Sequence, residues 1–173
     1  MAAFDGKQLT GRDWIGILAG ALALVVSFFS WRHLTGAQGV VEFLGTLGVK
    51  SWYTAWGSGV SGWLPVLMLI GAAALLLAPG FGIRVPGVPF AWLVLAFAAL
   101  VMIIIRWATL PEPDAGLLQA HNFRPEDVDA GASIGLYLGL AAALISLLGA
   151  VLRVLVALRP VHDQYTPRTE PLG

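Results

Sequence analysis

Residues 36–63 read GAQGVVEFLGTLGVKSWYTAWGSGVSGW and separate two long apolar runs of the chain. The run before this segment, Trp14–Trp31, holds eighteen residues without a charged side chain. A helix needs about 20 apolar residues to cross the roughly 30 Å of hydrocarbon in a bilayer. Residues 36–63 are therefore expected to form an extramembrane loop between two spanning helices.

Apolar runs further along the chain predict an all-α membrane protein, a four-transmembrane-helix bundle that forms a single membrane domain over residues 1–173. The predicted spans are residues 14–32, 63–79, 90–109 and 131–158, with outer loops at 33–62 and 110–130 and a cytoplasmic tail at 160–173. The prolines and glycines of PGFGIRVPGVP, residues 79–89, end the second span. A basic leader also precedes the apolar core of signal peptides, but the first run is longer than such a core, which favours an uncleaved span.

The composition indicates a protein of the lipid phase. Of 173 residues, 58% are hydrophobic and 12% are charged, whereas soluble domains carry about 25% charged residues. Ten basic residues are spread along the chain and form no basic patch for nucleic acid. The sequence has no cysteine, which excludes disulfides and thiolate metal sites. We interpret the abundance of Arg, Ala and Gly as the mark of a GC-rich bacterial genome.

The distribution of Lys and Arg predicts the orientation of the bundle. Four spans place both termini on one side, and six of the ten basic residues fall on that side: Lys7, Arg12, Arg84, Arg153, Arg159 and Arg168. Because short loops rich in Lys and Arg stay in the cytoplasm, both termini are expected to be cytoplasmic. The predicted location is the bacterial cytoplasmic membrane.

Five of the seven tryptophans lie near the ends of the predicted spans. Indoles settle at the level of lipid headgroups, so these residues are expected to form an aromatic belt. Trp14 and Trp92 would mark the cytoplasmic interface, and the outer interface would hold Trp31, Trp63 and Trp107.

Two arginines fall at similar depth on the outer side, each next to a tryptophan. Arg32 and Arg106 are expected to bind lipid phosphate or the acids of loop 110–130.

Pairs of small residues predict where the helices touch. Gly16 and Gly20 in the first span and Gly135 and Gly139 in the last each form a G-x-x-x-G pair. Because lipid tails are as apolar as leucine, membrane helices associate through close packing at such residues. The first and last spans are therefore expected to meet along these faces.

The first outer loop carries a strand pattern. VVEFL at residues 40–44 and VKSWYTAW at residues 49–56 are rich in β-branched and aromatic residues, and GTLG between them offers a turn. This pattern predicts a short β-hairpin. Trp52, Tyr53 and Trp56 are the predicted partner-binding residues, because aromatic side chains carry much of the energy at interfaces. The other interpretation is that they pack under the hairpin or lie at the headgroups.

Two patterns near the start of the last span are similar to chemical sites. Gly131–Gly135 matches G-x-S-x-G, with Ser133 in the nucleophile position, but a nucleophile elbow needs a preceding strand and the residues before it read as a loop. The acids and the histidine at residues 121–129 lack the spacing of a calcium loop. No catalytic residue, cofactor or metal is predicted.

The layout resembles that of small uncharacterised four-span membrane proteins of actinobacteria. The resemblance rests on the Trp-bounded first span, WGSGVSGWLP at residues 56–65, and the glycine-rich GASIGLYLGLAAALISLLGA at residues 131–150. A looser similarity is to claudin-like proteins, which also have a strand-bearing first outer loop, although this chain lacks their cysteine pair. Some proteins of the first kind are accessory subunits of envelope assemblies such as mycobacterial lipid importers and respiratory supercomplexes.

The resemblance implies a non-enzymatic accessory or assembly subunit of a larger cell-envelope complex, with membrane lipid and other membrane subunits as partners. The alternative is a lipid or small-solute transport component that acts as an oligomer. A membrane serine hydrolase using Ser133 is the third hypothesis.

Overall fold

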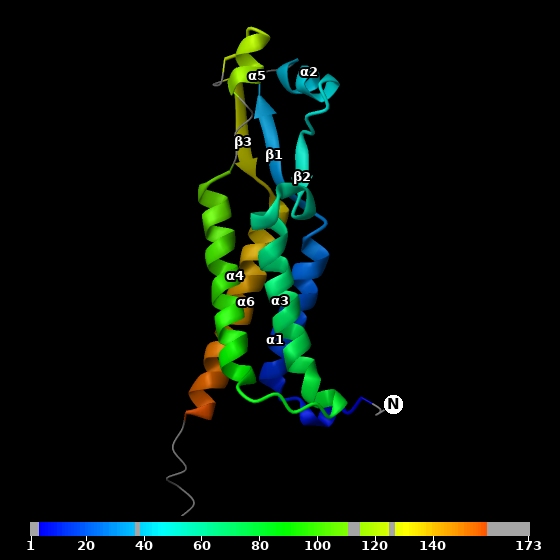
Figure 1. Ribbon diagram of the computed structural model, residues 1–173, viewed down its shortest axis with the longest axis vertical. Helices are drawn as coiled ribbons and strands as arrows, with labels where there is room; N and C mark the ends of the chain where they lie inside the picture. The colour runs from blue at the N-terminus through cyan, green and yellow to red at the C-terminus, as the bar shows by residue number, and fades with distance from the viewer. Residues whose placement is uncertain (1–3, 37–38, 111–114, 125–126, 159–173) are drawn as a thin grey trace, which may run out of the picture.

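The computed structural model describes residues 4–36, 39–110, 115–124 and 127–158. Within them, the long helices are α1 (Gly11–Val26), α3 (Val60–Leu77), α4 (Val88–Ala108) and α6 (Ile134–Ala157). They run alternately up and down, and a small sheet stands on one end of their bundle (Figure 1). We call this the sheet end, and the opposite end, where α1 begins and α6 ends, the terminal end. The predicted tail at residues 160–173 lies outside the described residues.

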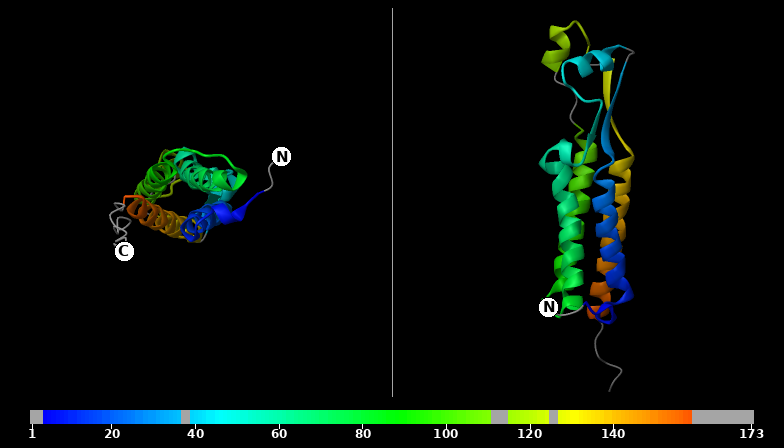
Figure 2. Two further views of the ribbon diagram at one scale, coloured as in Figure 1. Left: turned by 90° about the horizontal axis from the view of Figure 1, so that it is seen from below. Right: turned by 90° about the vertical axis from the view of Figure 1, so that its right-hand side faces the viewer.

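The four long helices form one ring around a common axis. Seen along that axis, α1 lies beside α3, α3 beside α4, and α4 beside α6, which returns to α1 (Figure 2). Helices consecutive in the chain are therefore neighbours in space, as in up-and-down bundles with short connections. The connection from α3 to α4 is the tightest, because η3 (Ala78–Phe81) ends at Gly82 and α4 starts after Gly87, both of which have a positive φ.

Three helices of the described chain are long and apolar enough to cross a membrane. They span Val60–Phe81, Val88–Ala108 and Ile134–Ala157, within or close to the ranges expected for the second to fourth spans. Helix α1 has 16 residues, about 24 Å at 1.5 Å per residue. It ends at Val26, earlier than the predicted limit at residue 32, because the chain turns at residues 27–29 and enters a strand.

The sheet has three antiparallel strands in the order β2-β1-β3. The central strand is β1 (Ser30–Gly36), which continues from α1, and its neighbours are β2 (Trp52–Thr54) and β3 (Val128–Ala132). Leu34 pairs with Ala130 and His33 with Trp52, so the sheet joins the segment between α1 and α3 to the segment between α4 and α6.

The predicted hairpin at residues 40–56 is wrong. Residues Val40–Thr46 form helix α2, and β2 pairs with β1 instead. Val40 and Leu44 are one helical turn apart and both buried. They pack with Leu34, Leu118 and Val128 in a small core, to which α5 (Ala115–Ala120) contributes Leu118. Burial of this face outweighed the strand propensity of the β-branched residues.

Trp92 fills the interior of the bundle near its terminal end. Its side chain is fully buried, and its Nε1 donates a hydrogen bond to Ser146 Oγ at 3.0 Å. A Cβ added at Gly16 of α1 would lie 2.5 Å from Trp92 Cζ2, and one at Gly149 of α6 would lie 2.9 Å from Cη2. The indole therefore needs a glycine on each of two neighbouring helices.

Trp31 fills the interior near the sheet end in the same way. It is buried and donates from Nε1 to the carbonyl of Val26 at 3.0 Å. A Cβ at Gly135 would lie 2.6 Å from Trp31 Cδ1, and one at Gly139 would lie 3.0 Å from Cζ2. Trp31 and Trp92 are thus part of the core, which corrects their predicted place at the lipid interface.

The glycine pairs also differ from expectation. Helices α1 and α6 are neighbours, but Gly135 and Gly139 face Trp31. Gly20 faces α3, where an added Cβ would lie 2.6 Å from Ala73 Cβ. These glycines make room for the indoles of Trp31 and Trp92 and for α3. The two glycine pairs therefore do not pack directly against each other.

Candidate functional site

The free edge of the sheet carries two exposed tryptophans. Strand β2 has only β1 as a neighbour in the described sheet. Trp52 in this strand is 55% exposed, and Trp56, which begins the short 3-10 helix η2 (Trp56–Ser58), is 40% exposed. Two of the three predicted partner-binding residues are therefore displayed near the sheet end of the bundle.

Trp56 is held in place by the end of α1. Its Nε1 donates to Ser27 Oγ at 2.9 Å, and the Ser27 hydroxyl donates to the carbonyl of Leu24 at 2.6 Å. The backbone N–H of Ala55 donates to the carbonyl of Ser27 at 3.1 Å. Ser27 and Ala55 are both buried. The exposed face of the Trp56 indole is thus presented in a fixed orientation.

Tyr53, the third predicted residue, is half-buried. The Arg32 guanidinium carbon lies 4.5 Å from the centroid of the Tyr53 ring, which is a cation–π arrangement. Arg32 and Tyr53 are also opposite each other in the register of β1 and β2. The Tyr53 side chain therefore stabilises the pairing of β1 with β2 and is not part of the exposed edge.

Arg106 lies in the last turn of α4. It is only 8% exposed. Arg32 and Arg106, which the sequence places at similar depth, thus belong to strand β1 and helix α4 and are 74 positions apart in the chain.

The remaining predicted interface tryptophans lie at the surface or close to it. Trp14 is exposed in the first turn of α1, and Trp107 is exposed near the end of α4. The Trp107 ring meets Tyr137 at the start of α6, with 6.3 Å between centroids. Trp63, near the start of α3, is half-buried.

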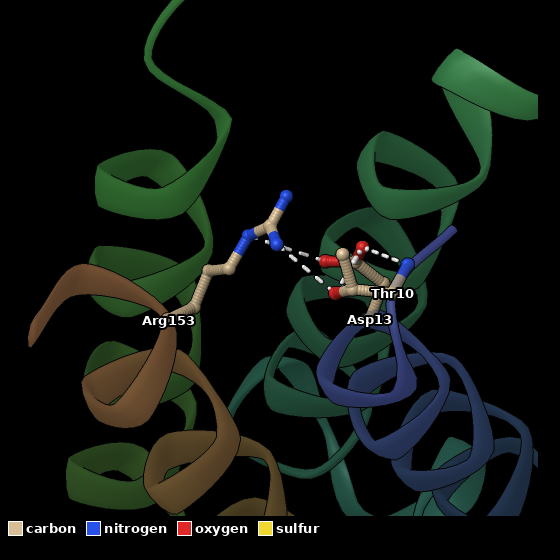
Figure 3. A network of polar contacts seen from close by, with 3 residues as sticks. All are labelled: Thr10, Asp13 and Arg153. Carbon is tan, nitrogen blue, oxygen red and sulfur yellow. Dashed lines mark hydrogen bonds and ion pairs between the residues drawn. The ribbon is translucent and has the colours of Figure 1, made fainter. Parts of the chain in front are cut away.

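Sequence reasoning missed a polar cluster at the terminal end. Thr10 precedes α1 and donates to Asp13 Oδ2 from both its backbone N–H, at 2.8 Å, and its hydroxyl, at 2.7 Å. Arg153 of α6 places Nε 3.5 Å from Asp13 Oδ1 and donates from Nη1 to Thr10 Oγ1 at 3.0 Å (Figure 3). The spacing Thr-x-x-Asp before an apolar run is a capping-box signal. It could have located Asp13, but not its partner on another helix.

The residues before Ser133 form strand β3 and not the loop that the sequence predicted, and α6 follows the serine. The serine-hydrolase pattern is nevertheless not assembled as a triad in the described chain. Ser133 precedes α6, and its backbone N–H donates to the carbonyl of Trp31 at 3.1 Å. No hydrogen bond joins its hydroxyl to His33 or His121 among the residues that the structure describes. Nor do those residues contain a group of three or more His, Cys, Asp or Glu side chains that could hold a metal ion.

The three apolar helices and the small sheet are consistent with an integral membrane protein. No protein-family model, no curated protein and no solved structure matches the chain.

Proposed function

We propose that this chain is a non-enzymatic, four-span protein of the bacterial cytoplasmic membrane that acts as an accessory or assembly subunit of a larger cell-envelope complex. In this proposal both termini are cytoplasmic, and the sheet lies on the outer face. The partner is another membrane subunit with a segment outside the bilayer. The observation that carries the proposal is the pair of exposed indoles beside the free edge of β2.

The proposal requires α1 to cross the membrane with the other three helices. Helix α1 packs between α3 and α6 along the same axis. Its outward face is apolar: Leu18 is 63% exposed, and Leu22 and Val25 are also exposed. Such a face is favourable against lipid and unfavourable against water. Although about 24 Å is short for a bilayer, thinning of the bilayer and flanking aromatic residues accommodate a short helix at modest cost.

Exposed aromatic residues support the position of the outer interface. At the sheet end, each long helix has an exposed aromatic side chain within it or a few residues from its end. These residues are Phe28 after α1, Trp56 before α3, Trp107 in α4 and Tyr137 in α6. Indoles and phenols prefer the headgroup region. The rest of the sheet would then stand beyond the headgroups, where a partner can reach it.

Trp52 and Trp56 are suited to a protein contact for different reasons. Trp52 is the more exposed and lies on the strand edge, whereas Trp56 is anchored to Ser27. Tryptophan is enriched among the residues that dominate interface energetics. An anchored side chain loses less conformational freedom on binding, which favours affinity.

The two buried tryptophans bear on the alternative of a transport component. Trp31 and Trp92 occupy the bundle interior at two levels. A solute path would therefore run between copies of the chain rather than through one bundle. A transport role thus calls for a homo-oligomer, whereas an accessory role calls for a foreign subunit.

Affinity purification from native membranes in mild detergent tests the proposal. We expect the tagged chain to retain a foreign membrane subunit in stoichiometric amount, and Trp52→Ala to reduce that subunit by about tenfold or more, as for a residue worth over 1.4 kcal/mol at an interface. Trp14→Ala is the matched control, because Trp14 is an exposed tryptophan at the terminal end. Recovery of copies of the chain alone, or an equal loss in the Trp14 variant, would reject the proposed docking surface.

A further inference from the structure

A cavity of about 240 Å³ opens at the terminal end of the bundle. Its wall comes from the start of α1, the end of α3, the turn between α3 and α4, the start of α4, and α6. We call it the terminal cavity and define it by Gln8, Asp13, Leu76, Arg84, Val88 and Arg153. It adjoins the Thr10–Asp13–Arg153 cluster drawn in Figure 3.

The cavity carries more positive than negative charge. Arg84 and Arg153 line it together with one carboxylate, Asp13. That carboxylate is already engaged, because Oδ2 accepts two hydrogen bonds from Thr10 and Oδ1 faces Arg153. Its side chain is 6% exposed. A ligand in the cavity therefore meets the two guanidinium groups more readily than the acid.

Asp13 also orients Arg153 for a further contact. The Nε and Nη1 atoms of Arg153 are directed at Asp13 and Thr10. The remaining guanidinium nitrogen points away from both residues (Figure 3). Arg153 is 31% exposed, so this nitrogen retains donor capacity. A guanidinium that is fixed on one side and open on the other suits an oxyanion with several acceptor oxygens.

The start of α4 adds to the positive potential. Val88, the first residue of this helix, lines the cavity, and the first turn of α4 contains no acidic residue. Helix N-termini carry a partial positive charge that favours anions. At the start of α1 the same effect is offset by Asp13.

The apolar part of the wall indicates where the anion is attached. Leu76 and Val88 lie in the same cavity as the two arginines, at the end of three helices that are apolar enough to cross a membrane. In a bilayer this end meets the headgroup region, where a phosphate lies next to glycerol and acyl carbons. A free anion has no apolar surface that could be buried against this wall.

We propose that the terminal cavity binds the phosphate ester of a membrane phospholipid through Arg84 and Arg153, with the lipid's glycerol region against Leu76 and Val88. Asp13 and Thr10 act as positioning residues that hold Arg153. This site is distinct from the exposed tryptophans of the sheet and does not depend on the docking proposed for them.

Native mass spectrometry of the purified full-length chain tests this site. The two probes are phosphatidylglycerol and diacylglycerol with the same acyl chains, which differ by the phosphate-bearing headgroup. We expect phosphatidylglycerol to be retained at least about tenfold better than diacylglycerol, and Arg84→Gln to lower its retention by about tenfold, the effect of losing one charge-assisted contact. Arg84 is exposed in a turn, so the variant should fold, which circular dichroism would check.

Arg12→Gln is the matched control, because Arg12 is exposed at the same end but does not line the cavity. Any basic residue near a membrane attracts anionic lipid, so an equal loss in this variant would overturn the proposal. Equal retention of diacylglycerol would also overturn it. A third arm offers inorganic phosphate in place of the lipids: retention of phosphate equal to that of phosphatidylglycerol at the same concentration would show a site for free anions and reject the lipid.

Discussion

The hydrogen bond between Trp92 Nε1 and Ser146 Oγ joins α4 to α6 over 3.0 Å inside the bundle. Both side chains are buried, and the serine is one of four buried polar or charged residues among those described. The bond satisfies an indole N–H that has been taken out of contact with solvent and lipid. It therefore explains why a serine lies on the interior face of α6.

Ser146→Ala should destabilise the protein by about 0.6 kcal/mol, the average for hydrogen bonds between membrane helices, and by no more than about 1.7 kcal/mol. The change leaves the indole N–H without its acceptor and removes little volume. Titration of the purified protein with a denaturing detergent, followed by circular dichroism, would measure it. Comparison with Trp92→Phe and the double variant isolates the pair energy, and strictly additive losses would contradict a direct bond.

Gly135→Ala should destabilise the bundle by about 1–3 kcal/mol, the cost of inserting a methyl group into a packed core. The new Cβ would lie 2.6 Å from Trp31 Cδ1 and 2.7 Å from the carbonyl oxygen of Ser30. Gly71→Ala is the control, because nothing lies within 4 Å of a Cβ at that helical position. Alanine there should be neutral or stabilising. The two melting temperatures in detergent provide the comparison, and equal values would mean that Trp31 does not occupy the Gly135 face.

Arg153→Gln should lower the free energy of unfolding by about 1 kcal/mol, because it leaves the buried Asp13 carboxylate without its cation. The cost stays below that of a fully buried pair, since the Arg153 side chain is 31% exposed and partly screened by solvent. Arg12→Gln, at an exposed position in the same turn as Asp13, should cost less. Detergent titration would measure both, and the double variant Asp13→Asn with Arg153→Gln should lose less than the sum of the single changes. A full sum would indicate two independent residues.

The sequence predicted the long helices because length and apolar composition decide whether a segment enters lipid. The runs at α3, α4 and α6 show this directly. The sheet could not be predicted in the same way, because β1 pairs with β3 across nearly a hundred residues, as Leu34 does with Ala130. In residues 40–44 the strand propensity of VVEFL predicted the wrong structure. The segment is helical because a helix buries Val40 and Leu44 on the same face.

The candidate sites show the same division between local and long-range information. Trp52 and Trp56 belong to the segment between α1 and α3, and their role in binding a partner stays a prediction, whereas the anchoring of Trp56 by Ser27 required the structure. Trp92 lies close enough to a helix start to suggest an interface residue. Its burial depends on Gly16 and Gly149, which belong to two other helices. The Asp13–Arg153 pair likewise joins residues 140 positions apart.

The central claim is that α1 crosses the membrane, so that the sheet and the terminal end lie on opposite sides. The chain has no cysteine, so a single cysteine can be introduced at an exposed position on each side, as Lys7→Cys near the terminal end and Lys50→Cys next to β2. Labelling with a membrane-impermeant maleimide in intact and in lysed cells locates each residue. We expect Lys50→Cys to be labelled in intact cells and Lys7→Cys only after lysis; labelling of both from the same side would show that α1 does not cross the membrane.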